Sequence, residues 1–321
     1  MKPTRWLRAL LAAMLAIGAT VAVGGLAPAS AHTWTGRTWT VQVGSESSNH
    51  LIQGMNYGPS DIWIDVGDTV HWTAAAMEPH TVSFIDAAHP LGDFFPGTPS
   101  FGYMSTRTWQ HTISKPGQFR NSGIMATMPI DLLPAPNYTS YSLKFTGVGT
   151  YTYYCYVHGA MMKGTVHVRA AGTPYPHSQR WYNARATLER ALVLLDGRLL
   201  RLKERLLATN HHVFVGAADD TALVMAFTRP HVTVHVGQTV TFDWGRNGFP
   251  VPHTVTFGPD PANPLAPVGD PQHYSHGTLS SGVLIAPTST FKVTFTKAGT
   301  YHYRCLIHDG MGMVGSVTVV R

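Results

Sequence analysis

One stretch occurs twice, as GTYTYYCYVHGAMMKG at residues 149–164 and as GTYHYRCLIHDGMGMVG at residues 299–315. Each copy has the aromatic, alternating pattern of a strand that ends at a cysteine. A histidine follows three residues after the cysteine, and a methionine follows after a short loop. Cys155 and Cys305 are the only cysteines in the 321 residues, and they hold the same place in the two copies. The duplication therefore predicts two equivalent sites built from cysteine, histidine and methionine.

The duplication extends upstream of this stretch. Residues 61–66 and 230–236 alternate between polar and apolar side chains, which is typical of a half-buried strand, and a turn and a second strand pattern follow in each half. Only 12% of the residues are charged, whereas glycine, proline and aromatic residues are plentiful, as in turn-rich β proteins. A repeat of this length indicates two copies of one β domain rather than a solenoid.

Two upstream histidines complete the pattern. His80 lies in EPHTVSF at residues 78–84, and His253 lies in VPHTVTF at residues 251–257. The cysteine follows the histidine by 75 positions in the first half and by 52 positions in the second. The additional length of the first half falls between residues 85 and 141, a region rich in proline, glycine and methionine to which the sequence assigns no role.

The combination of these side chains indicates copper. A thiolate and two imidazoles with a distant thioether form the trigonal site that is typical of blue copper. Structural zinc sites instead take four strong ligands and rarely include methionine. A disulfide bond between the two cysteines is the alternative, because disulfides are common in exported proteins. That bond would require two equivalent strands of separate domains to meet, and the duplicated contexts argue against it.

Both halves resemble the cupredoxins, the plastocyanin/azurin family of type 1 copper proteins. The resemblance rests on the PHTV motifs at residues 79–82 and 252–255 and on the two cysteine-histidine loops. It implies a mainly β fold, with two Greek-key β-sandwich cupredoxin domains joined by an amphipathic α-helix. It also implies a copper cofactor, held at two type 1 sites that alternate between Cu(I) and Cu(II).

The resemblance also selects the ligands. In the family the axial methionine is followed by any residue and then by a glycine, a pattern that residues 162–164 and 313–315 satisfy. This pattern favours Met162 and Met313 over the neighbouring Met161 and Met311. The implied copper ligands are His80, Cys155, His158 and Met162 in the first domain and His253, Cys305, His308 and Met313 in the second.

The first 31 residues are typical of a signal peptide. Lys2, Arg5 and Arg8 precede an apolar run over residues 10–23, and small residues at 29–31 provide a cleavage site. An uncleaved membrane anchor is the alternative interpretation. We expect an exported protein, either secreted or located in the periplasm or on the cell-envelope exterior. Cleavage would place His32 at the amino terminus, where its amino group and imidazole could chelate copper together.

The expected division of the chain follows from these patterns. Residues 1–31 are assigned to the signal peptide, 32–170 to the first cupredoxin domain, 171–212 to a linker that contains the amphipathic helix, and 213–321 to the second cupredoxin domain.

The linker carries a leucine repeat. The leucines are spaced 4-3-4-3-4, which is a helical heptad pattern, and Gly197 interrupts it. The pattern fits a connecting helix packed on one domain, a helix over residues 180–207 through which the protein forms a homo-oligomer, or a basic helix on a membrane surface. The repeat consists of Leu188, Leu192, Leu195, Leu199, Leu202 and Leu206.

The net charge of +6 lies mainly outside the β domains. Residues 1–31 contribute three positive charges, and residues 177–210 contain seven basic and three acidic residues. The remainder is close to neutral, so the sequence provides no basic surface for nucleic acid. We expect no nucleic-acid partner, and the predicted function does not require membrane contact.

The function implied by the resemblance is one-electron transfer with redox partner proteins. Copper storage or delivery is one alternative, and a copper oxidase or an enzyme similar to nitrite reductase is another. Such oxidases contain His-x-His pairs, and both enzymes use a histidine directly before the type 1 cysteine. No two of the 18 histidines here are separated by a single residue, and Tyr154 and Arg304 precede the cysteines. We therefore expect a carrier rather than an enzyme.

A second kind of copper centre between domains or subunits stays open as an enzyme hypothesis. Its ligands would come from other histidines of the β domains. The candidates are His71, His111, His231, His235, His273 and His276.

Overall fold

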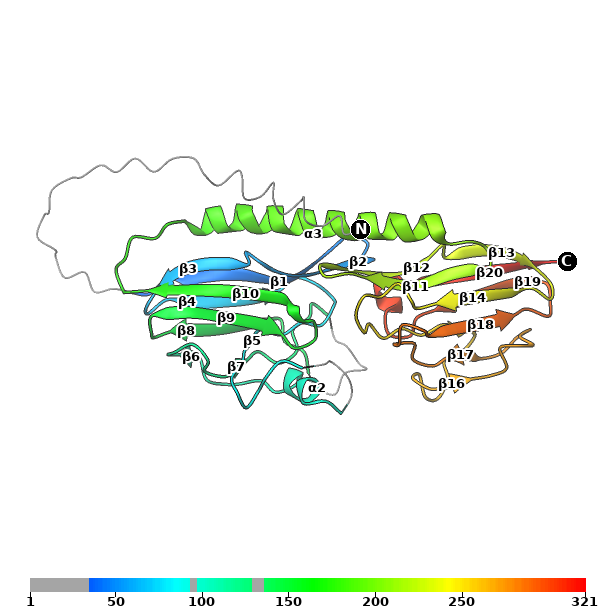
Figure 1. The fold of residues 1–321 in the computed structure, drawn as a ribbon, viewed down its shortest axis with the longest axis horizontal. Coiled ribbons are helices and arrows are strands. Elements are labelled where there is room, and N and C mark those ends of the chain that lie inside the picture. The colour runs from blue at the N-terminus through cyan, green and yellow to red at the C-terminus, as the bar shows by residue number, and fades with distance from the viewer. Residues whose placement is uncertain (1–34, 93–96, 129–135) are drawn as a thin grey trace, which may run out of the picture. The chain divides into compact units, whose positions relative to one another are not determined.

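The computed structural model of the protein describes residues 35–92, 97–128 and 136–321 (Figure 1). The predicted signal peptide at residues 1–31 and His32, which would begin the cleaved chain, lie outside these residues. Within the described ranges, no helix is both long enough and apolar enough to cross a membrane.

The described part of the first half consists of short strands and one short helix. These elements are β1 (Thr38–Glu46), β2 (Ile52–Gly58), β3 (Asp61–Asp65), β4 (Thr69–Ala74), β5 (Ser83–Phe84), α2 (Pro99–Met104), β6 (Thr112–Ile113), β7 (Arg120–Asn121), β8 (Ser140–Phe145), β9 (Gly149–Cys155) and β10 (Gly159–Arg169). The long excursion between residues 85 and 141 supplies α2, β6 and β7.

The second half begins after the helix α3 (Gln179–Leu207) and repeats the order of the longer strands. Its elements are β11 (His212–Ala218), β12 (Ala222–Thr228), β13 (His231–His235), β14 (Thr239–Asp243), β15 (Thr256–Phe257), β16 (Pro267–Val268), β17 (Leu279–Ser281), β18 (Thr290–Thr294), β19 (Gly299–Arg304), the 3₁₀ helix η1 (Asp309–Met311) and β20 (Val314–Val320). The prediction of a mainly β protein with an internal duplication is confirmed.

Each half is a β-sandwich. The first half has a five-stranded sheet in the order β3-β10-β9-β5-β7, and the second has a six-stranded sheet in the order β13-β20-β19-β15-β17-β16. Both sheets pack against one nine-stranded sheet in the order β18-β14-β11-β12-β2-β1-β4-β8-β6. Aromatic side chains fill the space between the layers in matching positions: the rings of Trp72 and Tyr153 lie 5.3 Å apart, and those of Phe242 and Tyr303 lie 5.0 Å apart.

The nine-stranded sheet joins the two halves. Strands β2 and β12 pair in the antiparallel direction, with Ile52 opposite Val224 and Gly54 opposite Ala222. This pairing covers two strand edges that would otherwise expose unpaired backbone groups. The sequence predicted the two sandwiches but not the strand pairing that connects them.

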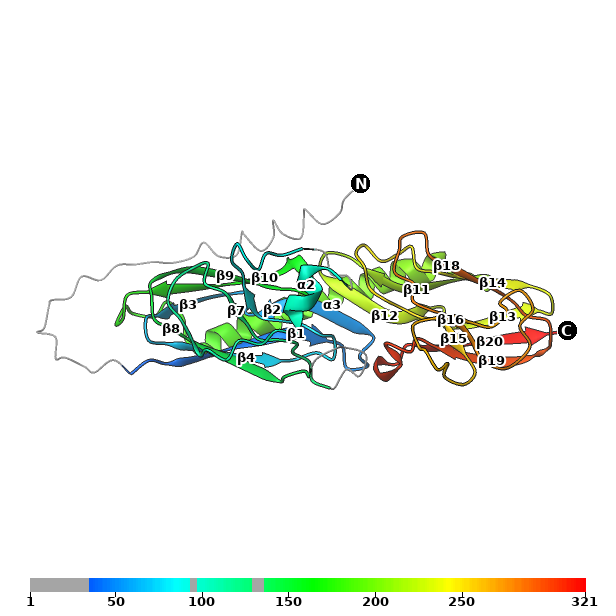
Figure 2. The ribbon, with the colours of Figure 1, turned by 90° about the horizontal axis from the view of Figure 1, so that it is seen from below.

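Helix α3 runs along the joint between the halves, over β2 and β12 (Figures 1 and 2). Ser178 caps its amino terminus by accepting a hydrogen bond from the backbone N–H of Trp181. The Glu189 carboxylate accepts a hydrogen bond from the backbone N–H of Ser60 in the first half, at 3.0 Å. The Glu204 carboxylate pairs with Arg246 of the second half, at 2.9 Å. The predicted connecting helix is present, and it packs on both halves rather than on one.

Gly197 lets the helix approach the sheet closely. A Cβ atom at this position would lie 2.4 Å from Cγ2 of Ile52 and 3.1 Å from Cβ of Ala222. The glycine that interrupts the leucine repeat is therefore at the contact with the sheet.

Replacing Gly197 with leucine is expected to lower the free energy of unfolding by about 1–3 kcal/mol, because overpacking displaces Ile52 or the helix. Leucine is a better helix former than glycine, so a loss of stability would report on packing rather than on helix propensity. Chemical denaturation of the full chain measures the effect. The exposed Arg198→Leu variant is the control and should change stability by no more than about 0.5 kcal/mol. An unchanged or raised stability of Gly197→Leu would contradict the close packing.

Candidate metal centres

The first candidate centre lies at one end of the first sandwich. Cys155 is the last residue of β9, and His158 follows in the turn before β10. His80 comes from the segment before β5 and exchanges two backbone hydrogen bonds with Met125, at 2.9 and 2.7 Å. The Nδ1 atom of His158 lies 3.1 Å from Nδ1 of His80 and 3.4 Å from Sγ of Cys155. All three side chains are buried.

The second candidate centre repeats this arrangement. Cys305 follows β19 directly, and His308 precedes η1. His253 exchanges backbone hydrogen bonds with Leu284, at 3.0 and 2.7 Å. The Nδ1 atoms of the two histidines lie 3.1 Å apart. The Sγ atom of Cys305 lies 3.9 Å from Nδ1 of His253 and 3.5 Å from Nδ1 of His308.

These distances fit one metal ion at each centre. The three donor atoms of the second centre form a triangle with sides of 3.1, 3.5 and 3.9 Å, so a point about 2 Å from each of them exists. That separation is typical of bonds from a metal ion to imidazole nitrogen and thiolate sulfur. In each centre, one cysteine and two histidines are the donor set that copper takes in trigonal sites. The residues present therefore fit copper.

Burial favours the neutral form of the four histidines. Burial lowers the pKa of His158 to about 3, and burial together with the nearby His158 lowers the pKa of His80 well below its ordinary value. Burial also lowers the pKa of His253 and of His308, the latter despite the opposing charge of Glu78. A neutral imidazole keeps a lone pair for a metal ion, so burial prepares all four rings as ligands.

Each cysteine sulfur accepts a backbone hydrogen bond. The N–H of Thr81 donates to Sγ of Cys155, and the N–H of Thr254 donates to Sγ of Cys305, both at 3.3 Å. Burial raises the pKa of the Cys155 thiol to about 11. Burial also acts to raise the pKa of the Cys305 thiol. The hydrogen bond and charge of His253, together with the N–H of Thr254, outweigh this effect, so the pKa of Cys305 is lowered. Both cysteines are free and lie in different hydrophobic clusters, so they do not form the alternative disulfide.

The methionines differ in their surroundings. Met162, on β10, is fully buried in the same cluster as Cys155, whereas Met161 is 36% exposed. Met313 is fully buried in the cluster of Cys305, and its backbone carbonyl accepts the N–H of Cys305 at 3.1 Å. Met311 packs into the cluster of the first half instead. Met162 and Met313 are thus each buried in the cluster that contains the cysteine of their own half.

Two glycines behind the upstream histidines were missed in the sequence. Gly44 and Gly216 sit at irregularities of β1 and β11 and have φ angles of 74° and 72°. A Cβ atom at Gly44 would lie 2.4 Å from Nε2 of His80, and one at Gly216 would lie 2.3 Å from Nε2 of His253. The imidazole rings therefore rest directly against these two backbone positions. The signal was available as a Val-Gly pair at residues 43–44 and 215–216.

A buried carboxylate beside the first centre was also missed. Oε1 of Glu78 lies 3.4 Å from Nε2 of His158, and both side chains are almost inaccessible to solvent. Burial raises the pKa of Glu78 to about 7, while the charge of His308 opposes this rise. Glu78 therefore lies beside His158 of the first centre and interacts through its charge with His308 of the second. The repeat gives no signal for it, because Val251 occupies the matching position in the second half.

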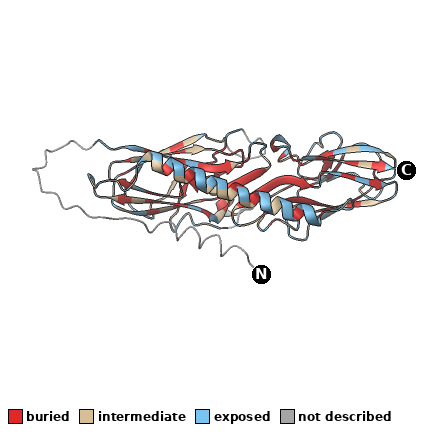
Figure 3. Ribbon diagram, turned by 90° about the horizontal axis from the view of Figure 1, so that it is seen from above, coloured by how far each residue is buried: buried red, intermediate tan, exposed pale blue. Residues whose placement is uncertain are grey.

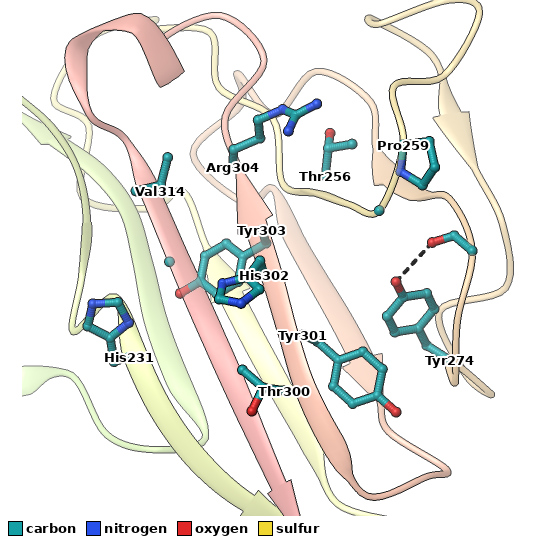
Figure 4. A pocket seen from close by; sticks show the side chains of 13 residues that line it. His231, Thr256, Pro259, Tyr274, Thr300, Tyr301, His302, Tyr303, Arg304 and Val314 are labelled. Carbon is teal, nitrogen blue, oxygen red and sulfur yellow. Dashed lines mark hydrogen bonds between the residues drawn. The ribbon is translucent and has the colours of Figure 1, made fainter.

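A pocket of about 460 Å³ opens on the outer face of β19 (Figure 4). His302 and Arg304 project from this strand into it, and the Tyr274 hydroxyl donates a hydrogen bond to the carbonyl of Gly277 at its edge, at 3.0 Å. The pocket is lined by neither Cys305 nor His308, so it is separate from the second centre.

The remaining described histidines belong to no further group of metal-ligating side chains. In the ranges that the structure describes, two groups of three histidine, cysteine or acidic residues bring their ligand atoms within 4.8 Å of one another, and both are the centres described above. The six candidates for a second kind of copper centre are in neither group: His71, His111, His231, His235, His273 and His276.

Comparison with known proteins identifies relatives of both halves. The model of the copper-binding proteins of the plastocyanin/azurin family matches residues 45–169 and again residues 212–320. Plastocyanin from Sambucus nigra is 33% identical over 110 residues, which are 33% of this chain and 97% of that protein. The chloroplastic plastocyanin of Fritillaria agrestis is 34% identical over 110 residues, again 33% of this chain but only 58% of that protein.

Solved structures of amicyanin are also similar. Amicyanin from Paracoccus versutus is 24% identical, with a TM-score of 0.24, and the match covers 35% of this chain and 81% of that one.

Proposed function

The chain belongs to the plastocyanin/azurin family of copper-binding proteins, and from that premise we propose that it is an exported electron carrier with two type 1 copper sites. The observation that carries the proposal is the pair of matched, buried triads, in which two imidazole Nδ1 atoms and one Sγ atom converge. The first site would be held by His80, Cys155 and His158. The second would be held by His253, Cys305 and His308, with Met162 and Met313 as the axial ligands.

The protein's own contribution is to hold these donors still. When bound, copper supplies a centre that gains and loses one electron. The cysteine is anchored to a strand end by the N–H of Thr81 or Thr254, and the upstream histidine is fixed by two backbone hydrogen bonds. Burial keeps the imidazoles neutral and excludes water from the donors. Donors that do not move between oxidation states lower the reorganisation needed for electron transfer.

A redox titration of the copper-loaded protein tests the proposal. We expect intense blue absorption that bleaches on reduction and returns on oxidation. A colourless protein that holds only Cu(I) would contradict it and favour storage or delivery. More than two coppers per chain together with turnover of oxygen or nitrite would favour the enzyme.

The location and division of the chain belong to the same proposal. Residues 1–31 would direct export and be removed, which places the carrier outside the cytoplasm with redox proteins as partners. Domain boundaries at residues 32–170 and 213–321, with the linker at 171–212, agree with the family matches at residues 45–169 and 212–320. Mass determination of the exported protein tests the cleavage, since a mature chain that retains residues 1–31 would contradict it.

We also infer that the protein forms a homo-oligomer through α3. Five of the six leucines of the repeat are exposed, whereas Leu194 and Gly197 are buried. Figure 3 shows that the exposed residues of α3 face away from the strands. The exposed heptad repeat forms an apolar stripe along α3. Such a stripe is suited to pack against the same stripe of a second copy of the protein. The exposed members of the repeat are Leu188, Leu195, Leu199, Leu202 and Leu206.

Replacing Leu199 and Leu206 together with glutamate is expected to convert a dimer into a monomer, because the charges would be buried between the helices. Light scattering after size-exclusion chromatography measures the mass. Arg180→Glu, which makes the same change in net charge outside the repeat, is the control and should leave the dimer intact. A monomeric wild-type protein at high concentration would contradict the inference.

A further inference from the structure

A buried carboxylate lies at the contact between the two ligand loops. Glu78 lies two residues before His80 in the first half, and its Oε1 atom is 3.4 Å from Nε2 of His158. The second ligand loop reaches the residue before it, because Met311 packs into the cluster that contains Met77. The charge interaction between Glu78 and His308 agrees with this placement.

The orientation of His158 gives this contact chemical meaning. Its Nδ1 atom faces His80 and Cys155, so the opposite nitrogen, Nε2, points out of the centre and toward Glu78. A histidine that binds a metal ion through one ring nitrogen commonly donates the N–H of the other to a carboxylate. That carboxylate fixes the ring and makes it a more basic ligand. Glu78 stands in this position.

The fold itself does not require a carboxylate here. Val251 occupies the matching position before Pro252 and His253, where it is buried as an apolar side chain. A buried carboxylate is costly unless its partners offset the loss of water. Among the described residues, neither Oε2 of Glu78 nor Nε2 of His158 has a hydrogen-bond partner, although Oε1 of Glu78 lies 3.4 Å from that nitrogen. A histidine that binds metal and thereby gains positive character would supply the missing compensation.

Apolar side chains of the second half lie against the neighbours of Glu78. The ring of Phe249 lies 5.8 Å from that of His158, and Met311 packs into the cluster that contains Met77. A Cβ atom on Gly310, in the second ligand loop, would lie 4.0 Å from Cε of Met77. Charges interact more strongly in such surroundings than in water.

We propose that Glu78 couples the two copper sites, by accepting the Nε2–H of His158 within the apolar contact between the two ligand loops. This inference rests on the proposed function. A change of charge at one site is then felt at the other through one shared neighbour. With copper bound at both sites, the contact between the two ligand loops would let one electron pass from a reduced site to an oxidised site. One copper would then be oxidised as the other is reduced, with no bond formed or broken.

The test measures the reduction potential of each site by itself. The Cys305→Ser background leaves only the first site, and the Cys155→Ser background leaves only the second. In both backgrounds, Glu78→Gln is expected to raise the potential, because a lost negative charge destabilises the oxidised ion more than the reduced one. Cu(II) affinity of the first site should fall by about tenfold or more, as is usual for loss of such a carboxylate.

Asp309→Asn is the matched control. Asp309 is an exposed carboxylate that also acts on His308, so its loss should raise the potential of the second site and leave that of the first unchanged. If glutamine at position 78 disturbs folding, Glu78→Val is the second variant, because valine occupies the matching position of the second half. Glu78→Val should also raise both reduction potentials.

The outcomes separate this proposal from the proposed function. Wild-type protein without blue absorption would overturn the proposed function, whatever the variants do. Blue wild-type protein in which the Glu78 variants shift only one potential, or neither, would overturn the coupling and leave the electron carrier standing.

Discussion

Replacing Cys155 with serine is expected to remove the blue absorption of the first site and leave that of the second, so that about half of the absorption remains. Serine fills nearly the same space and can accept the hydrogen bond from Thr81, but it supplies no thiolate, which is the ligand that defines this kind of site. Copper analysis and visible spectra of the loaded protein measure the effect.

The duplication supplies its own control. Cys305→Ser should remove the other half of the absorption, and the double variant should be colourless. A single variant with the full absorption of the wild type would show that its cysteine does not bind copper. A single variant that abolishes all absorption would show that the sites do not form independently.

Replacing Gly44 with alanine is expected to release copper from the first site and to destabilise the protein by about 1–2 kcal/mol. The backbone at this position has a left-handed φ angle of 74°, which costs about 1–2 kcal/mol for a residue with a Cβ atom. That atom would also lie 2.4 Å from Nε2 of His80, so the imidazole must leave the position in which it faces His158 and Cys155. Copper affinity and thermal unfolding without metal measure the two effects separately.

Two other glycines distinguish backbone strain from displacement of the ring. Gly216→Ala should act in the same way on the second site, because its Cβ atom would lie 2.3 Å from Nε2 of His253. Gly237 has a φ angle of 85° but no atom within 4 Å of a Cβ position. Gly237→Ala should therefore lower stability and leave both sites loaded. Equal copper loss in all three variants would contradict the proposed role of the glycines.

The ligand triads could be predicted from the sequence because their geometry is mostly local. Cys155 and His158 are three residues apart at the end of one strand, and the second copy repeats the spacing. The upstream partner, His80, is 75 positions away, yet it was found because His253 has the same flanking residues. The repeated motif therefore identified a histidine that is distant in the sequence but close to Cys155 in the fold.

The features that the sequence did not reveal depend on contact between the halves. The pairing of β2 with β12 involves strand edges, and the alternating pattern that predicts a strand does not specify its neighbour. Glu78 has no counterpart in the second half, so the repeat could not single it out, and its proximity to His308 exists only in the folded chain. Glycine is a poor helix former, so the sequence indicated that Gly197 weakens the helix. In the structure, Gly197 lies where α3 packs closely against Ile52.

Copper analysis combined with EPR spectroscopy of the purified, oxidised protein tests the central claim most directly. Two coppers per chain, both with type 1 signals, are the predicted result. A single copper per chain, or a signal from any other type of copper site, would contradict the account of two matched type 1 centres.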